Sequence, residues 1–284
     1  MKPSRLLHLV ANRGNAFECP ENTLPALRSA FDLGARFVEL DVQLSSDGVP
    51  MVIADHALSR IAGLTTHVTD MTADQLAKVD VSNPQNFGER FLGTCIPRLS
   101  DALDLLERRP EVTAFIVIGK ESLARFGHEQ MLPHVIRTLQ PFRARYVITS
   151  TDLPAIYQAR LIADYPIGWI LPRYDSHTRL KFEALQPEFL LCKRDHIADT
   201  SRLWRGPWKW VIRDVETLED SLDAAWRGAH FVSTSRVRRL SDAMRAHALT
   251  RMQARAAALH ITTLVSLDRP PPVPTIFSAR PSSG

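Results

Sequence analysis

Polar residues that suit chemistry on an anion or a cation stand at the ends of three short apolar runs, as Asn12-Arg13, Glu39-x-Asp41 and Lys120. Because side chains alternate along a strand, the carboxylates of Glu39 and Asp41 project from the same face. Two acids inside an apolar strand are costly unless they bind a cation or hydrogen-bond donors. Arginine and lysine are the natural partners of a phosphate. The pattern therefore predicts a site for a cation, an oxyanion or both.

Nine strand-like runs alternate with helix-length segments and must position these residues. The runs are 6–11, 37–42, 50–53, 114–118, 146–148, 167–171, 189–191, 210–212 and 231–233. Strand–helix alternation of this kind favours an α/β fold with a parallel sheet, and eight units over about 250 residues make a TIM (β/α)₈ barrel. One run is extra, and we place it in a hairpin at the turn Ser46-Asp47-Gly48. Function in such a barrel sits at the carboxyl ends of the strands.

The C-terminal stretch has a different composition. Five prolines fall from Pro270 onward, among serine and glycine, in a sequence that has no regular pattern. We predict a barrel domain over residues 1–262 and a Pro-rich, unstructured tail over 263–284. Docking of the tail on a partner protein is the alternative, and the sequence does not identify that partner.

Composition and charge exclude several classes of protein. The net charge is only +4, from 35 basic and 31 acidic residues, so nothing points to nucleic acid as a partner. No run of about 18 apolar residues predicts a membrane span. The three cysteines lie far apart, which fits neither a disulfide framework nor a zinc site. A cytoplasmic location is the default expectation.

The order of these motifs resembles a known family. Asn12-Arg13-Gly14, Pro20-Glu21-Asn22-Thr23, Glu39-Leu40-Asp41 and Asp47-Gly48-Val49-Pro50 are similar to the N-terminal signature of the glycerophosphodiester phosphodiesterases, and the likeness continues to residues 231–234. The resemblance implies a TIM barrel of the phosphatidylinositol-phospholipase-C-like phosphodiesterase type. It also implies lipid metabolism, in which a glycerophosphodiester is cleaved to glycerol 3-phosphate and an alcohol with Ca²⁺ or Mg²⁺.

Four residues match functional positions of this family. Glu39 and Asp41 match two of three carboxylate metal ligands, Arg13 matches an arginine that contacts the phosphate, and Lys120 matches a lysine at the end of the fourth barrel strand. Oxygen ligands suit hard cations, which agrees with the metal role of the two acids. The implied ligand is therefore a phosphodiester or a glycerol phosphate.

Three positions depart from the family pattern. Asn12 and Ala54 stand where the family has two histidines that act as general acid and base, and neither side chain exchanges protons near neutral pH. The third metal carboxylate is expected two residues before Lys120, on the same strand face, where this chain has Ile118. A divalent cation would therefore be held weakly, by two carboxylates of three.

Three nearby residues are weaker candidates for the site. His56 follows Ala54 by two positions and is a candidate replacement base, while Glu121 is a candidate replacement metal ligand. The position of Glu121 has the wrong parity for an undistorted strand. Trp210 either lines a glycerol or lipid subsite or packs in the core, and the sequence leaves both readings open.

Three functions follow from the sequence. The first is a pseudoenzyme of the glycerophosphodiester phosphodiesterase family, which binds a phosphodiester or phosphate with little hydrolysis. The second is an active metal-dependent phosphodiesterase that recruits His56 or Glu121. The third is a non-catalytic scaffold whose tail and barrel surface bind protein partners.

Overall fold

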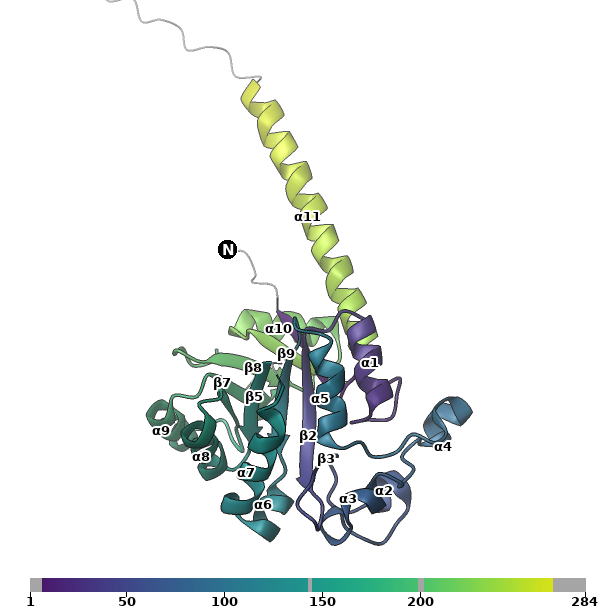
Figure 1. Ribbon diagram of the computed structural model, residues 1–284. Helices are drawn as coiled ribbons and strands as arrows, with labels where there is room; N and C mark the ends of the chain where they lie inside the picture. Colours follow the sequence, from purple (N-terminus) through teal and green to yellow (C-terminus); the bar gives the residue numbers. More distant parts are fainter. Residues whose placement is uncertain (1–6, 143–144, 199–201, 268–284) are drawn as a thin grey trace, which may run out of the picture. The chain divides into compact units, whose positions relative to one another are not determined.

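The computed structural model describes residues 7–142, 145–198 and 202–267, and side chains as far as residue 254. Within these residues, eight parallel strands close into a TIM barrel because β1 pairs with both β2 and β9 (Figure 1). The barrel strands are β1 (His8–Asn12), β2 (Phe37–Leu44), β4 (Thr113–Ile118), β5 (Arg145–Ser150), β6 (Ile167–Ile170), β7 (Phe189–Lys193), β8 (Lys209–Arg213) and β9 (Phe231–Thr234). The predicted fold class is confirmed.

The extra strand predicted from the sequence, at residues 50–53, forms the expected hairpin with β2. β3 (Pro50–Val52) pairs antiparallel with the end of β2, Val42 opposite Val52 and Leu44 opposite Pro50. Gly48 has φ +78° in the connecting turn, a conformation that glycine adopts without strain. The hairpin extends β2 beyond the barrel and leads the chain into a long excursion before β4.

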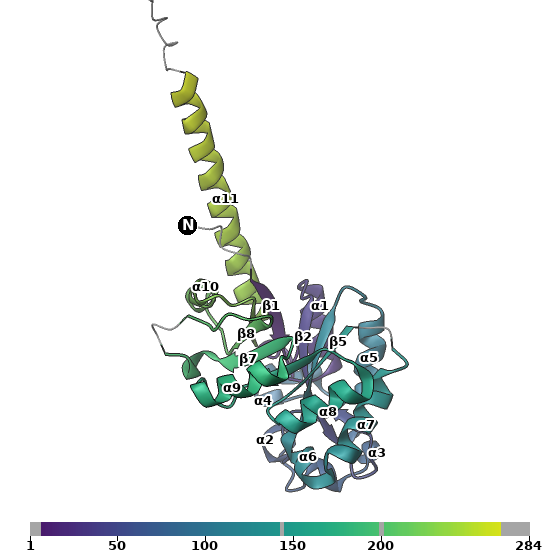
Figure 2. The same cartoon turned by 90° about the vertical axis from the view of Figure 1, so that its left-hand side faces the viewer.

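Helices cover the outer face of the barrel, as Figures 1 and 2 show from two sides. They are α1 (Leu24–Asp32), α5 (Leu99–Glu107), α6 (Lys120–Phe126), α7 (His128–Leu139), α8 (Leu153–Ala163), α9 (Ser176–Leu185) and α10 (Leu218–Arg227). A further helix, α11 (Val237–Leu267), follows β9 in the chain. Several begin at a side chain that accepts a hydrogen bond from a backbone N–H of the first turn, namely Thr23, Asp152, Asp175 and Thr217. Such caps fix where each strand-to-helix loop ends.

Alternation along the strands separates two apolar cores. In β4, Phe115 packs inside the barrel, whereas Ile116 and Ile118 pack outward in a large core with the helices. The barrel interior is filled by a layer of four phenylalanines, Phe37, Phe115, Phe189 and Phe231, whose ring centroids lie 4.9–6.5 Å apart in neighbouring pairs. This layer closes the barrel below its carboxyl end.

The segment between β3 and α5 forms a small lobe with its own core. It contains the short helices α2 (Ser59–Ala62), η1 (Val68–Asp70), α3 (Ala73–Leu76), α4 (Pro84–Phe87) and η2 (Gly88–Phe91). Buried side chains such as Leu58, Val68, Leu76 and Ile96 hold it together. The lobe begins where the sequence places Ala54 and His56, so its packing decides where those residues point.

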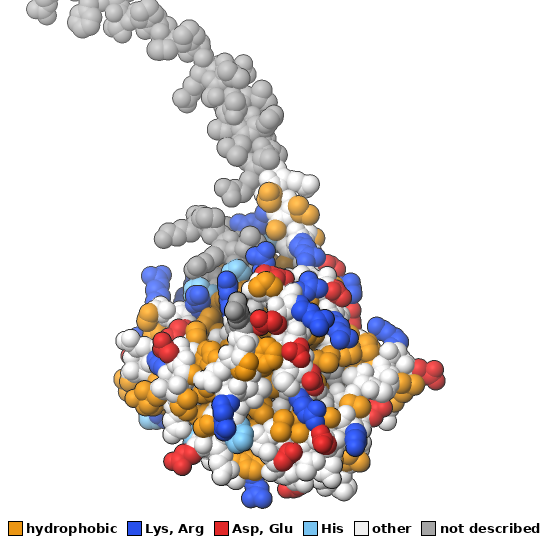
Figure 3. Space-filling view, viewed as in Figure 1, with side chains coloured by type: hydrophobic (Ala, Val, Ile, Leu, Met, Phe, Trp, Pro, Cys, Tyr) orange, Lys and Arg blue, Asp and Glu red, His pale blue; other side chains and the backbone are white. Residues whose placement is uncertain are grey.

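The chain divides into two units, Met1–Ser241 and Asp242–Gly284, so the first unit ends before the boundary expected after residue 262. Helix α11 begins in the first unit and continues through the described part of the second. The prolines of the predicted tail lie outside the described residues, and its lack of structure stays a prediction. No helix among the described residues is long and apolar enough to cross a membrane. Basic and acidic side chains are interspersed over the face shown in Figure 3.

Candidate functional site

The end of β1 carries the first site residues in a constrained turn. Asn12 is the strand partner of Glu39 in β2, so both lie on the interior face of the barrel. Arg13 follows with φ +57°, and its N–H donates to the carbonyl oxygen of Glu39 at 3.0 Å. At Gly14 a Cβ would approach Ala26 to 2.7–2.8 Å, and φ is +77°. The turn therefore requires glycine here, and it brings the arginine toward β2.

Arg13, Asp41 and Asn22 form one polar cluster. Arg13 Nε lies 2.8 Å from Asp41 Oδ2, and Asn22 Nδ2 donates to the same oxygen at 3.0 Å. Asn22 Oδ1 accepts from the backbone N–H of Asp41 at 3.2 Å, which fixes the amide on both sides. Burial lowers the pKa of Arg13, but the carboxylates of Asp41 and Glu21 outweigh it and raise that pKa above its usual value.

Glu39 pairs with Arg213 of β8, a site residue that was not predicted from the sequence. Its side chain is fully buried and accepts from Arg213 Nη2 at 2.7 Å. Burial raises the pKa of Glu39, and the charge of Arg213 opposes that effect. The charge of Glu39 in turn raises the pKa of Arg213. The available signal was strand alternation, since Arg213 stands two residues after Val211 on the same face of β8.

Four buried polar atoms at this end of the barrel make no hydrogen bond to another described protein atom. They are Asn12 Oδ1, Glu39 Oε2, Arg213 Nε and Ser233 Oγ. Their strands, β2, β1, β9 and β8, are neighbours in the sheet. Buried polar groups of native proteins nearly always have partners, so this cluster is arranged to contact something other than the chain itself.

The end of β4 differs from the sequence prediction. Val117, the strand partner of Asp41, lies on the interior side beside Phe115, whereas Ile118 is 2% exposed in the outer core. The prediction that Ile118 faces the site is therefore wrong. Lys120 begins α6 rather than ending the strand, and its side chain is 73% exposed, 3.8 Å from Glu121. Counting two residues back from Lys120 gives Ile118, whose side chain faces outward, because Lys120 is not part of β4.

Glu121 and Ala54 meet at Gln43 instead of at the acid pair. Gln43 Nε2 donates to Glu121 Oε2 and to the carbonyl oxygen of Ala54, each at 3.2 Å. Gly119 gives room for this amide, because a Cβ there would lie 2.4–2.5 Å from it. The structure therefore brings Glu121 to the barrel mouth but binds it to an amide.

His56 is held within the small lobe. Its Nε2 lies 2.9 Å from Thr69 Oγ1, and its ring stacks on His67 with centroids 4.6 Å apart. Its neighbour Asp55 forms an ion pair with Arg60 on α2. Ala54, in contrast, lines a cavity of about 150 Å³ from which His56 is absent.

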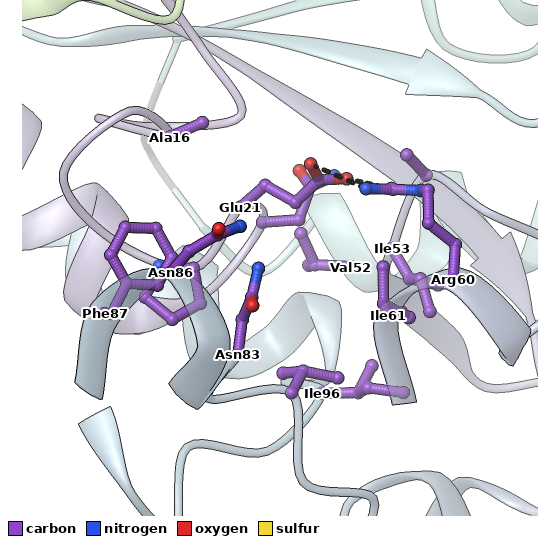
Figure 4. A pocket seen from close by; sticks show the side chains of 14 residues that line it. Ala16, Glu21, Val52, Ile53, Arg60, Ile61, Asn83, Asn86, Phe87 and Ile96 are labelled. Carbon is purple, nitrogen blue, oxygen red and sulfur yellow. Dashed lines mark hydrogen bonds and ion pairs between the residues drawn. The ribbon is translucent and has the colours of Figure 1, made fainter. Parts of the chain in front are cut away.

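That cavity lies between the loop before α1 and the small lobe (Figure 4). Its polar lining includes Glu21 and the amides Asn83 and Asn86, and its apolar lining includes Ile53, Ile61 and Ile96. Arg60 pairs with Glu21 across the cavity. Glu21 also accepts from Arg13 at 3.0 Å, so one carboxylate joins the cavity to the strand-end cluster. No local sequence pattern indicates Arg60, because only the folded lobe brings it to Glu21.

Trp210 does not face the site. Its side chain is 2% exposed, and its indole N–H donates to the carbonyl oxygen of Trp204 at 2.9 Å. The ring packs against Phe182 of α9 and against Tyr174, outside the strands. Of the two readings of Trp210, the structure supports core packing, and the subsite reading is wrong.

The residues present do not fit the divalent cation that the fold family implies. Two carboxylates remain, Glu39 and Asp41, and each is paired with a guanidinium group. The corresponding position in β4 is Val117, which has no ligand atom. The described part of the chain contains no group of three or more His, Cys, Asp or Glu that could hold a metal ion. Hard cations need several oxygen ligands, which this arrangement does not offer.

Comparison with known proteins gives a consistent result. The profile of the glycerophosphoryl diester phosphodiesterase family matches residues 13–200. A glycerophosphodiester phosphodiesterase of Caldanaerobacter subterraneus is 39% identical over an alignment of 229 residues, and the match covers 78% of this chain and 91% of that protein. An Oleispira antarctica phosphodiesterase solved with sn-glycerol-3-phosphate has a similar fold, with TM-score 0.75 and 19% identity over 84% of this chain and 97% of that one. A Silicibacter pomeroyi structure has TM-score 0.74 and 20% identity over 86% and 95%. The chain belongs to the glycerophosphoryl diester phosphodiesterase family.

Proposed function

We propose that this protein binds the phosphate of a glycerophosphodiester or glycerol phosphate, with hydrolysis lost or strongly reduced. The observation that carries the proposal is the state of the acid pair: Glu39 and Asp41 are both neutralised by arginines, beside an asparagine at position 12. General acid and base groups contribute roughly 10²–10⁴-fold each to a rate. Neither Asn12 nor Ala54 can supply that contribution.

Two partly exposed arginines support phosphate binding. Arg13 and Arg60 share Glu21, with 30% and 54% of their side chains exposed. A phosphate is a strong acceptor for the guanidinium N–H groups that these ion pairs leave exposed. The Oleispira antarctica phosphodiesterase was solved with sn-glycerol-3-phosphate, and we take the ligand class from it. We take Arg13 as the first phosphate contact. Lys120 lies at the start of α6 with an exposed side chain, and it could contact the phosphate only after a rearrangement of α6.

An assay of hydrolysis tests the loss of activity. Glycerophosphocholine and a chromogenic diester are incubated with Ca²⁺, Mg²⁺ or Mn²⁺, beside the Glu39→Gln/Asp41→Asn variant. We expect turnover at background in both proteins. Metal-dependent turnover that disappears in the variant would overturn the proposal.

A thermal shift with sn-glycerol 3-phosphate tests binding. Ligand at one hundred times its Kd stabilises the native state by about 2.7 kcal/mol. We expect a clear rise in Tm at millimolar ligand, which Arg13→Ala removes and the exposed control Arg28→Ala retains. No rise in the unaltered chain would count against a phosphate site and in favour of the scaffold function.

An active enzyme is the second candidate, and the 39% identity with a protein named as a phosphodiesterase favours it. Such an enzyme needs His56 to leave Thr69 and His67, or Glu121 to leave Gln43. Turnover that falls in His56→Ala or Glu121→Gln, but not in the neighbouring His67→Ala, would support this candidate.

A cytoplasmic location is also part of the proposal. It rests on three cysteines that are free and far apart in the sequence, two of them buried. Burial raises the pKa of Cys192 to about 12, so its thiol is unreactive where it lies. Cell fractionation with an antibody against the chain would test the location, and recovery with membranes would contradict it.

A further inference from the structure

The cavity beside Ala54 has the shape and position of a second ligand subsite. Its volume of about 150 Å³ admits a group of a few heavy atoms. Ala54 lies on its wall. Glu21 connects it to Arg13, the proposed phosphate contact, through a 3.0 Å hydrogen bond.

Two amides provide its unused hydrogen-bonding capacity. The side chains of Asn83 and Asn86 point into the cavity from the start of α4 (Figure 4). Asn83 is half-buried and Asn86 is exposed, and no hydrogen bond joins either side chain to another described residue. Each amide offers a carbonyl acceptor and an NH₂ donor, which together suit a hydroxyl group that both donates and accepts.

The charges of the cavity are already balanced. Its ionised lining residues are Glu21 and Arg60, and they pair with each other. Arg13 also pairs with Glu21, and Asp55 with Arg60, so the cavity has no free carboxylate for a cationic group. The apolar side chains of Ile53, Phe87 and others complete the wall. The lining therefore favours a small neutral group that carries hydroxyls.

We infer that this cavity binds the alcohol portion of a phosphodiester, and that it selects a neutral polyol such as glycerol over choline or ethanolamine. The inference rests on the proposed function, because the phosphate at Arg13 and Arg60 brings the alcohol to the cavity. It goes further in naming the class of diester and the residues that select it. Asn83 and Asn86 are then specificity-determining residues of the subsite.

Calorimetric titration of the full chain in EDTA, with three probes, tests the inference. The probes are glycerophosphoglycerol, glycerophosphocholine and sn-glycerol 3-phosphate. Two added hydrogen bonds of about 1 kcal/mol each make glycerophosphoglycerol roughly thirtyfold tighter than either other probe. Asn83→Ala/Asn86→Ala should remove this advantage, whereas Gln85→Ala, an exposed change on the same helix outside the cavity, should keep it.

A charge-changing variant sharpens the test. Asn83→Asp puts a carboxylate in the cavity and should shift the preference toward glycerophosphocholine, at an unchanged Tm. Equal affinity for the two diesters in the unaltered chain, or an advantage that survives the double alanine variant, would overturn the inference while leaving phosphate binding intact. Failure of all three probes to bind would instead overturn the proposed function and this subsite with it.

Discussion

Two layers of the barrel interior, which share strands β2 and β9, have opposite chemistry. In β2 and β9, Phe37 and Phe231 belong to the phenylalanine layer, and two residues later Glu39 and Ser233 belong to the mouth. The lower layer is closed by ring contacts, while the upper keeps polar atoms that lack partners. The phenylalanines stabilise the barrel. The polar layer contains the buried Glu39–Arg213 pair and, among the described residues, buried polar atoms without partners, and we propose that it serves binding.

Restoring chemistry at the mouth has the largest expected effect. Asn12→His, Ala54→His and Val117→Glu, combined with Arg213→Asn to free Glu39, should recreate metal-dependent hydrolysis of glycerophosphodiesters. Two general acid–base groups at roughly 10²–10⁴-fold each give a large gain in kcat.

The matched control replaces Val117→Glu by Ile118→Glu. It should give no activity and a lower Tm, since Ile118 is 2% exposed in the outer core and its replacement buries a charge there. Equal activity of the two combinations would show that the interior face of β4 has been misassigned.

Arg213→Met should cause the largest loss of stability from a single change in the mouth. It leaves the fully buried Glu39 without its guanidinium, and breaking a buried pair costs about 3–5 kcal/mol. Glu39→Gln/Arg213→Met, which removes both charges, should recover most of that loss. Urea unfolding at pH 7 measures the difference, and a single-variant loss under about 1 kcal/mol would contradict the buried pair.

The free energy of unfolding of Arg213→Met should fall as the pH rises toward neutrality. Burial already raises the pKa of Glu39, and removing Arg213 removes the charge that opposes this shift. A carboxyl whose folded pKa lies above its unfolded pKa contributes stability below the unfolded value and loses it as pH rises through the folded value. Arg213→Met should therefore be most stable in mild acid and weaken toward neutrality, and the double variant should lose this slope.

Phe115→Leu tests the lower layer with a smaller effect. The ring contacts Phe189 at 5.1 Å in a T-shaped arrangement, and replacing this fully buried phenylalanine by the smaller leucine costs about 1–2 kcal/mol. Binding of sn-glycerol 3-phosphate should stay within twofold, because the ring lies below the ligand layer. A large loss of affinity at unchanged stability would break the division between the layers.

Features that depend on residues close together in the sequence could be predicted, and contacts between residues far apart in the sequence could not. The nine strands depend on local apolar runs, and the hairpin depends on a turn with glycine. The acid pair of Glu39 and Asp41 depends only on spacing within one strand. Arg213 and Glu39 meet across 174 positions of sequence, which no local pattern encodes. The face of Ile118 was misread because Gly119 ends β4 beside Gln43 and lets α6 begin at Lys120, so spacing counted from the lysine fails.

Ser233→Ala gives the smallest expected effect and the opposite sign. Its buried hydroxyl has no partner among the described residues, and relieving an unsatisfied polar group is worth about 1 kcal/mol. The variant should therefore be slightly more stable in urea, whereas Thr234→Val, which removes a hydroxyl that accepts from the N–H of Arg236, should be less stable. If Ser233 instead contacts the bound ligand, Ser233→Ala also weakens binding of sn-glycerol 3-phosphate. A loss of stability without ligand would mean that the hydroxyl of Ser233 stabilises the fold. The polar layer would then contribute to stability, as the phenylalanine layer does, and the two layers would not differ in function.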